Sequence, residues 1–188
     1  MFAFNFTINR AQAFAICTHH RDVHVPPNDI IDIRGKIKLD MVEIGAGGGS
    51  IARVDALNQI TIGPDSAGAD PGPAVYGRGG EQCTITDADI HLGRIDPDRF
   101  AGGQVPLTPD RAEVVLTADI GEKLDLSSQM AAYGVTEMVD ETMANAARVH
   151  AVEQGKAASD YTLIAFGGAA PLHALSRSHH QLVGLGSK

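Results

Sequence analysis

The fold is decided by residues 43–55, which read Glu-Ile-Gly-Ala-Gly-Gly-Gly-Ser-Ile-Ala-Arg-Val-Asp. Four glycines fall within five positions here, and β-branched residues follow them. The pattern predicts a strand, a tight glycine turn and a second strand, so we expect a β-hairpin over Glu43–Ile62. Glycine tolerates φ > 0, and successive N–H groups in such a turn can form an anion-binding nest. A hairpin whose glycine turn is purely structural is the alternative.

A long loop follows at residues 64–80, with the sequence Pro-Asp-Ser-Ala-Gly-Ala-Asp-Pro-Gly-Pro-Ala-Val-Tyr-Gly-Arg-Gly-Gly. Its three prolines exclude a helix and a central strand. Bulky residues and prolines alternate with the glycines, so the loop is rigid and is not a flexible linker. Long loops inside a domain are usually functional or disordered.

Three helices are predicted downstream. Residues Thr86–Gly93 form a short helix, which Thr86 caps and Gly93 ends. A second helix begins at Thr108-Pro109 and runs to about Asp125. The third extends over Ser127–Gln154, where Gly155 stops it. Its apolar residues follow helical spacing: Ala131, Val135, Met138, Val139, Met143, Ala146 and Val149. We expect Asn145, Arg148 and His150 to be exposed or to lie near the helix end.

A buried strand is predicted over residues 160–166, because this run is largely apolar. Residues 167–170 read Gly-Gly-Ala-Ala and lead into a helix that begins at Pro171. Free N–H groups and the positive end of the helix would face a ligand at such a turn. The sequence therefore predicts a second anion or nucleotide contact here.

The first forty residues carry weaker patterns. Ala11–Ile16 could begin a helix, and Ile30–Ile33 could be a short strand. The run His19–His24 contains three histidines and an aspartate, but its spacing fits no recognised zinc site. We interpret it as a polar segment near the chain end.

Composition limits the class of protein. The chain has 188 residues, 44% of them hydrophobic and 20% charged, which is typical of a soluble globular domain. The formal net charge of −8 argues against nucleic acid or an anionic membrane as a partner. Cys17 and Cys83 are the only cysteines and suggest a reducing compartment. Without a basic segment ahead of its apolar start, the chain shows no signal peptide, and we expect it in the cytoplasm.

Five segments together resemble one family, the hydantoinase A / 5-oxoprolinase family. This family includes ATP-dependent N-methylhydantoinase subunits and subunits of acetone and acetophenone carboxylases. The segments that carry the resemblance are Ile44–Asp55, Gly63–Gly80, Thr84–Gly103, Met143–Gly155 and Thr162–Ala174. We therefore expect a partial nucleotide-binding domain over residues 41–175, with residues 1–40 and 176–188 unassigned.

The resemblance implies an α/β fold of the actin-like, ribonuclease-H-like ATPase type, with ATP and Mg²⁺ as cofactors. It places the terminal phosphates of ATP near the glycine turn and adenosine near the second turn. The residues implied at the phosphates are Gly45, Gly47, Gly48, Gly49 and Ser50, and those implied at adenosine are Gly167, Gly168 and Ala169. Asp87 and His173 are candidate metal ligands, and no catalytic residue is assigned. A hydantoinase B-type subunit is the expected partner.

The function implied is ATP-coupled, ring-opening hydrolysis of a cyclic amide. An ATP-dependent ketone carboxylase subunit is one alternative, and a non-catalytic assembly module is another. The family's first phosphate loop, of the Asp-x-Gly-Gly-Thr type, is not found in residues 1–40. Phosphoryl transfer needs several positioned elements at once, so we expect a fragment that is inactive alone.

Overall fold

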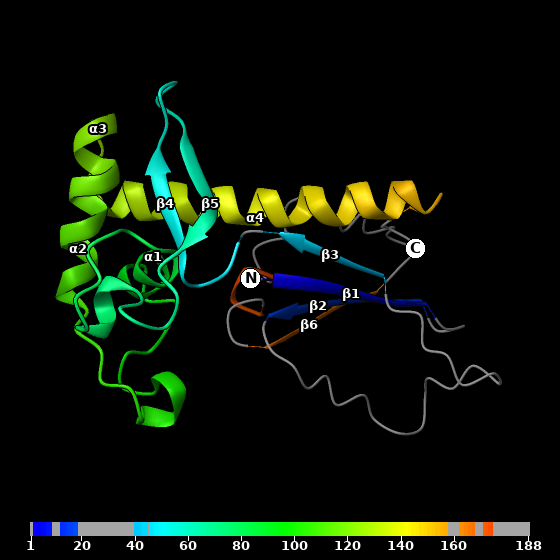
Figure 1. Ribbon diagram of the computed structural model, residues 1–188, viewed down its shortest axis with the longest axis horizontal. Helices are drawn as coiled ribbons and strands as arrows, with labels where there is room; N and C mark the ends of the chain where they lie inside the picture. The colour runs from blue at the N-terminus through cyan, green and yellow to red at the C-terminus, as the bar shows by residue number, and fades with distance from the viewer. Residues whose placement is uncertain are drawn as a thin grey trace, which may run out of the picture. The chain divides into compact units, whose positions relative to one another are not determined.

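The computed structural model describes residues 2–8, 12–18, 40–44, 46–157, 162–167 and 171–174. The chain divides into two compact units (Figure 1). The first unit comprises residues 1–44 and 144–188, and the second comprises residues 45–143. Strands and helices are mixed along the chain, so the predicted α/β class is confirmed.

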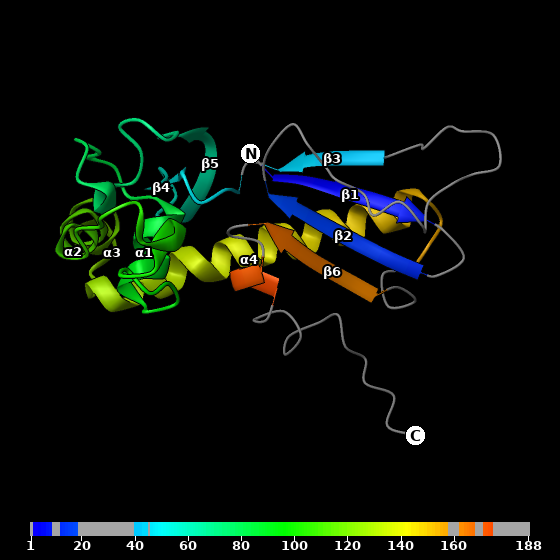
Figure 2. The ribbon, with the colours of Figure 1, turned by 90° about the horizontal axis from the view of Figure 1, so that it is seen from below.

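The first unit contains a four-stranded sheet with the order β3-β1-β2-β6 (Figure 2). Strand β1 pairs antiparallel with β2 and β3, whereas β6 pairs parallel with β2. The strands are β1 (Phe2–Ile8), β2 (Gln12–Thr18), β3 (Asp40–Ile44) and β6 (Thr162–Gly167). The predicted strand near the C-terminus is thus confirmed from Thr162 onward.

The predicted helix at Ala11–Ile16 is wrong, because residues 12–18 form strand β2. Phe14, Ile16 and Thr18 recur every second residue, which is the period of a strand, and all three are aromatic or β-branched. The segments His19–His24 and Ile30–Ile33 lie outside the described residues.

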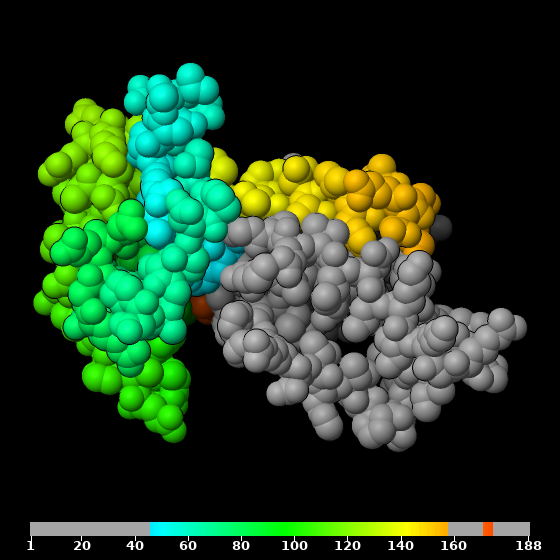
Figure 3. Space-filling model, viewed as in Figure 1, coloured from blue at the N-terminus to red at the C-terminus, as the bar shows by residue number. Residues whose placement is uncertain are grey.

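In the second unit, β4 (Ser50–Val54) and β5 (Ile60–Ser66) form an antiparallel hairpin (Figure 1), whose atoms form the cyan projection of the space-filling view (Figure 3). Its turn lies at residues 55–59, so the predicted hairpin turn at the glycines is wrong. Asp55 Oδ1 accepts hydrogen bonds from Leu57 N (2.8 Å) and Gln59 N (2.9 Å), and Asn58 has a φ of 58°. Aspartate favours such turns because its side chain accepts hydrogen bonds from nearby backbone N–H groups, and asparagine favours them because it tolerates a positive φ. The glycine run instead joins β3 of one sheet to β4 of another.

The Pro/Gly loop after β5 is irregular apart from one 3₁₀ turn, η1 (Ala74–Tyr76). The backbone of the loop packs against itself at Gly72 and Gly80. A Cβ on Gly80 would lie only 2.3 Å from Gly72 O. Val75 O accepts a hydrogen bond from Thr108 N (2.7 Å). The rigid loop predicted for residues 64–80 therefore agrees with the structure, except that β5 extends to Ser66.

The helices follow the predicted order. They are α1 (Ile85–His91), α2 (Asp110–Leu116), α3 (Glu122–Leu124) and α4 (Ser128–Glu153), with a short 3₁₀ turn, η2 (Phe100–Gly103), between α1 and α2. A π-helical turn, η3 (Thr117–Gly121), joins α2 to α3, and Asp125 ends this continuous stretch with a φ of 56°. Gly155, with a φ of 67°, follows α4. No helix in the described part of the chain combines the length and apolarity needed to cross a bilayer.

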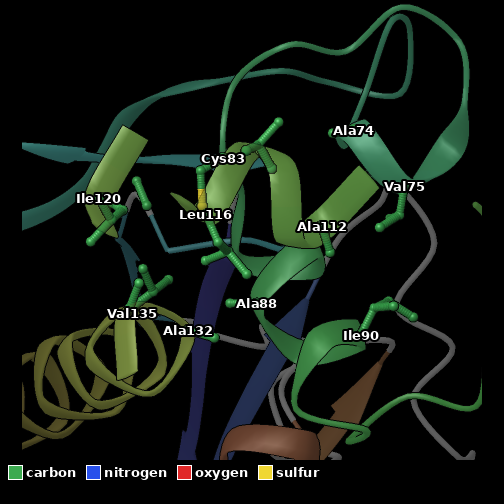
Figure 4. Packing of buried hydrophobic residues seen from close by; sticks show 13 residues of the cluster. Ala74, Val75, Cys83, Ala88, Ile90, Ala112, Leu116, Ile120, Ala132 and Val135 are labelled. Atoms are coloured by element: carbon green, nitrogen blue, oxygen red, sulfur yellow. The ribbon is translucent and has the colours of Figure 1, made fainter. Parts of the chain in front are cut away.

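The core of the second unit lies among α1, α2, η3 and the first part of α4 (Figure 4). It is built from small and medium-sized side chains, which allow close packing of the helices. Its members include Ala52, Ala74, Val75, Cys83, Ala88, Ile90, Ala112, Val115, Leu116, Ile120, Ala131, Ala132 and Val135.

The buried face of α4 differs in part from the predicted one. Val139 and Met143 are buried as expected, but Met138 is 37% exposed and Val149 is 48% exposed. His150 was expected to be exposed or to lie near the helix end; it lies in the last turn of α4 but is only 4% exposed. It lies seven residues after Met143, hence on the same side of the helix.

Candidate functional site

The glycine turn, residues Gly47–Ser50, is held by its own hydrogen bonds. Gly47 N donates to Ser50 Oγ (2.8 Å), and Ser50 N donates to Gly47 O (2.7 Å). Gly49 O accepts from Ala67 N (2.8 Å), just beyond the end of β5. The turn therefore has one defined conformation before any ligand is considered.

The turn rests on the first residues of α1. Thr86 donates twice to Gly48 O, through its backbone N and its Oγ1, both at 2.9 Å. A Cβ on Gly48 would lie 2.7 Å from Thr86 Oγ1, which is too close for ordinary contact. Contrary to the prediction of a positive φ, Gly48 does not have one. Glycine is needed here because another part of the chain packs against it.

Two backbone N–H groups of the turn remain for a ligand. Gly48 N and Gly49 N have no acceptor within the described part of the chain, and both residues are partly exposed. The other two predicted donors, Gly47 and Ser50, use their N–H groups inside the turn. Of the described N–H groups that were predicted to form an anion-binding nest, Gly48 N and Gly49 N are therefore the two that remain available. Two adjacent donors suit an anionic oxygen.

Asp87, a candidate metal ligand, is fully buried at the start of α1. Its Oδ2 accepts from Thr84 N (2.9 Å), Thr84 Oγ1 (2.7 Å) and Ala74 N (3.3 Å), and its Oδ1 accepts from Val75 N (2.9 Å). Thr84, not the predicted Thr86, is the N-cap of α1, and Asp87 completes a capping box with it. The carboxylate therefore ties the Pro/Gly loop to α1.

The Asp87 carboxyl group and the Cys83 thiol both have raised pKa values. Burial raises the pKa of Asp87, although its hydrogen bonds to Thr84, Val75 and Ala74 act in the opposite direction. Burial also raises the pKa of the Cys83 thiol well above its usual value, and the negative charges of Asp87 and Asp119 add to this. Asp119 in η3 accepts a hydrogen bond from Cys83 N (2.7 Å). The Cys83 thiol is free and buried.

The other predicted site residues belong to the first unit or lie outside the description. Gly167 is the last residue of β6, while Gly45, Gly168 and Ala169 lie outside the described residues. His173 is fully buried in the helical segment 171–174. That the two turns converge on one nucleotide stays a prediction. Among the described residues, no group of three His, Cys, Asp or Glu side chains could hold a metal ion.

The sequence pattern indicated Thr86 in place of Thr84 as the cap of α1, and it gave no sign that Thr86 contacts Gly48. The signal for Thr84 was present: residues 84–87 read Thr-Ile-Thr-Asp, and a threonine followed three residues later by an acid is a common helix start. Thr86 gave no local signal, because its partner Gly48 lies 38 residues away.

Known proteins are similar to this chain in sequence. The family model described as Hydantoinase/oxoprolinase matches residues 35–181. The acetophenone carboxylase gamma subunit of Aromatoleum aromaticum is 41% identical over 136 residues, which are 72% of this chain and 19% of that protein. The caprolactamase subunit alpha of Pseudomonas jessenii is 38% identical over 146 residues, 76% of this chain and 21% of that protein.

Two solved structures resemble the model. The ATP-dependent caprolactamase from Pseudomonas jessenii has a TM-score of 0.68 and 37% identity, and nucleotide-free acetone carboxylase has a TM-score of 0.69 and 34% identity. Each alignment covers 76% of this chain and 20% of the other. The chain thus spans about a fifth of the length of these two curated relatives. Because the family model covers most of its residues, the chain belongs to the hydantoinase/oxoprolinase family.

Proposed function

We propose that this chain is the nucleotide-contacting part of an ATP-dependent subunit that opens a cyclic amide by hydrolysis. The observation that carries the proposal is the similarity to ATP-dependent caprolactamase, at 37% identity and a TM-score of 0.68 over 76% of the chain. Caprolactam is a cyclic amide, and amide hydrolysis at neutral pH needs activation of an unreactive carbonyl. When bound, ATP would supply a phosphoryl group to the amide oxygen and so make the carbonyl carbon reactive toward water.

The residues of this chain would bind and orient the nucleotide. The N–H groups of Gly48 and Gly49 would donate to oxygens of the terminal phosphates, because they are adjacent, partly exposed and without acceptors among the described residues. Gly167, Gly168 and Ala169 would contact the adenosine side, as the actin-like fold of the proposal requires. Mg²⁺ would be held mainly by phosphate oxygens and water, which are its usual ligands in nucleotide sites.

Ketone carboxylation is the second candidate, and one observation favours it as well. Acetone carboxylase matches the same share of the chain with a TM-score of 0.69. In that reaction ATP would activate bicarbonate as a carboxyl phosphate, and the enolate carbon of the ketone would form a bond to its carbon while phosphate leaves. Both candidate reactions would use the same glycine turn, so the residues that decide between them would lie elsewhere in the protein.

The test is reconstitution with a companion subunit. The relatives are named as subunits, so we expect a hydantoinase B-type protein to complete the enzyme in the cytoplasm. The chain would be combined with this subunit and MgATP, and phosphate release would be measured with caprolactam, 5-oxoproline, or acetone plus bicarbonate. Release that depends on a cyclic amide supports the first proposal, and release that depends on ketone and bicarbonate supports the second. If no substrate raises phosphate release above background, both proposals are refuted for this chain.

A further inference from the structure

The geometry points to a positioning role for a residue that touches no nucleotide: we propose that Thr86 aims the Gly49 N–H at the bound phosphate. The inference rests on the proposed nucleotide contact and adds a residue to it. It follows from the way in which peptide groups transmit orientation along the glycine turn.

Gly48 O and Gly49 N–H belong to one peptide group. A trans peptide group is planar, and its C=O and N–H point in opposite directions. The cis peptide bonds of the described residues lie elsewhere, at Gly63-Pro64 and Asp70-Pro71. Whatever fixes Gly48 O therefore also fixes the direction of Gly49 N–H, on the opposite side of the plane.

Thr86 is what fixes Gly48 O. Its N and Oγ1 both donate to this oxygen at 2.9 Å, so the plane is held by two bonds from one residue. Thr86 is 6% exposed, and its position is set by the capped start of α1. Gly49 N–H is thereby turned away from α1, and it has no acceptor among the described residues.

The neighbouring donor is oriented in a different way. Gly48 N–H belongs to the peptide whose oxygen, Gly47 O, accepts from Ser50 N at 2.7 Å. That bond lies within the turn and does not involve α1. Loss of the Thr86 hydroxyl should therefore change the orientation of Gly49 N–H more than that of Gly48 N–H. The amide signals of the two glycines can distinguish this effect.

The test uses Thr86→Ala with two comparison variants. Thr86→Ser keeps the hydroxyl and should behave as the wild type. Thr136→Ala is the matched control, because Thr136 Oγ1 also donates to one backbone oxygen, Tyr133 O at 2.9 Å, but lies on α4. Amide ¹H–¹⁵N spectra would be recorded for each protein without ligand and during titration with MgATP.

We expect Thr86→Ala to shift the Gly49 amide without ligand and to weaken MgATP binding about fivefold, because one of the two hydrogen bonds that hold Gly48 O is lost and Gly49 N–H is then less firmly oriented toward the phosphate. Both comparison variants should bind as the wild type does. Should Thr86→Ala fail to fold, Thr86→Val, which keeps the volume and removes the hydroxyl, should give the same loss of affinity.

Equal affinity of Thr86→Ala and the wild type overturns the inference, as does an equal loss in Thr136→Ala. A wild-type Gly49 amide that does not respond to MgATP refutes the proposed nucleotide contact itself, and the inference with it. A wild-type response that persists unchanged in Thr86→Ala refutes only the role of Thr86.

Discussion

Replacement of Asp87 by asparagine should destabilise the second unit strongly, because the carboxylate serves four donors. Three of these reach Oδ2, from Thr84 N, Thr84 Oγ1 and Ala74 N, and the fourth, Val75 N, reaches Oδ1. Asparagine can keep its oxygen at the Oδ2 position, but its NH₂ group must then face Val75 N–H. A buried donor left without an acceptor costs about 2 kcal/mol. Alanine removes both acceptors and should cost about 4 kcal/mol.

The chain has no tryptophan, so urea unfolding would be followed by far-ultraviolet circular dichroism. A loss of 2 kcal/mol should lower the urea midpoint by about 1 M. Asp119→Asn is the matched control: Asp119 receives one described donor, Cys83 N at 2.7 Å, and asparagine can keep an oxygen there. We expect its midpoint to change by less than about 0.3 M. If Asp87→Asn unfolds at the same urea concentration as the wild type, the network around Asp87 does not stabilise the fold as argued.

Three further predictions concern packing and protonation. Gly48→Ala should cost about 2 kcal/mol by overpacking against Thr86 Oγ1, and Thr86→Ala in the same chain should recover at least half, which a double-mutant cycle in urea would measure; additive losses would contradict this. In the folded protein Cys83 keeps its proton because its pKa is raised, whereas in the unfolded chain the thiol loses its proton above about pH 8.5. The free energy of unfolding should therefore fall by up to about 1.4 kcal/mol per pH unit above that pH, and Cys83→Ala should lack this fall. The same pH dependence of stability in both proteins from about pH 8 to 9.5 would argue against this. Gly134→Ala should stay within about 0.5 kcal/mol of the wild type in thermal unfolding, because its Cβ meets only the flexible end of Ile60 at 2.7 Å while helix propensity improves; a large loss would mean that Ile60 cannot move.

Local sequence patterns predicted the helices well, because their ends carry strong signals. Pro109 marks the start of the second helical stretch, and Gly155 follows α4 with a positive φ. Asp125 ends the stretch before α4 in a left-handed conformation, close to the predicted boundary. The π-helical turn within that stretch was not predicted, since nothing in residues 117–121 distinguishes it from α-helix.

The candidate site was predicted only in part, because long-range contacts determine it. The glycines resemble a hairpin turn locally, but Gly48 is required by Thr86, which no pattern within the turn reveals. Asp87 has the side chain of a possible metal ligand, but its oxygens accept from Ala74 N and Val75 N, which lie 13 and 12 residues away and so leave no local pattern. His150 was expected at the surface or near the end of α4 and lies in its last turn, but its burial was not predicted.

The central claim is that the glycine turn contacts a nucleotide phosphate. The most direct measurement is a titration of the ¹⁵N-labelled wild-type chain with MgATP, observing the amides of Gly48 and Gly49. Gly155, which lies beyond α4 in open space, serves as the internal reference. The account predicts weak, saturable shifts that are largest at Gly48 and Gly49 and small at Gly155. Unchanged Gly48 and Gly49 amides at saturating MgATP, or shifts no larger than that of Gly155, would contradict it.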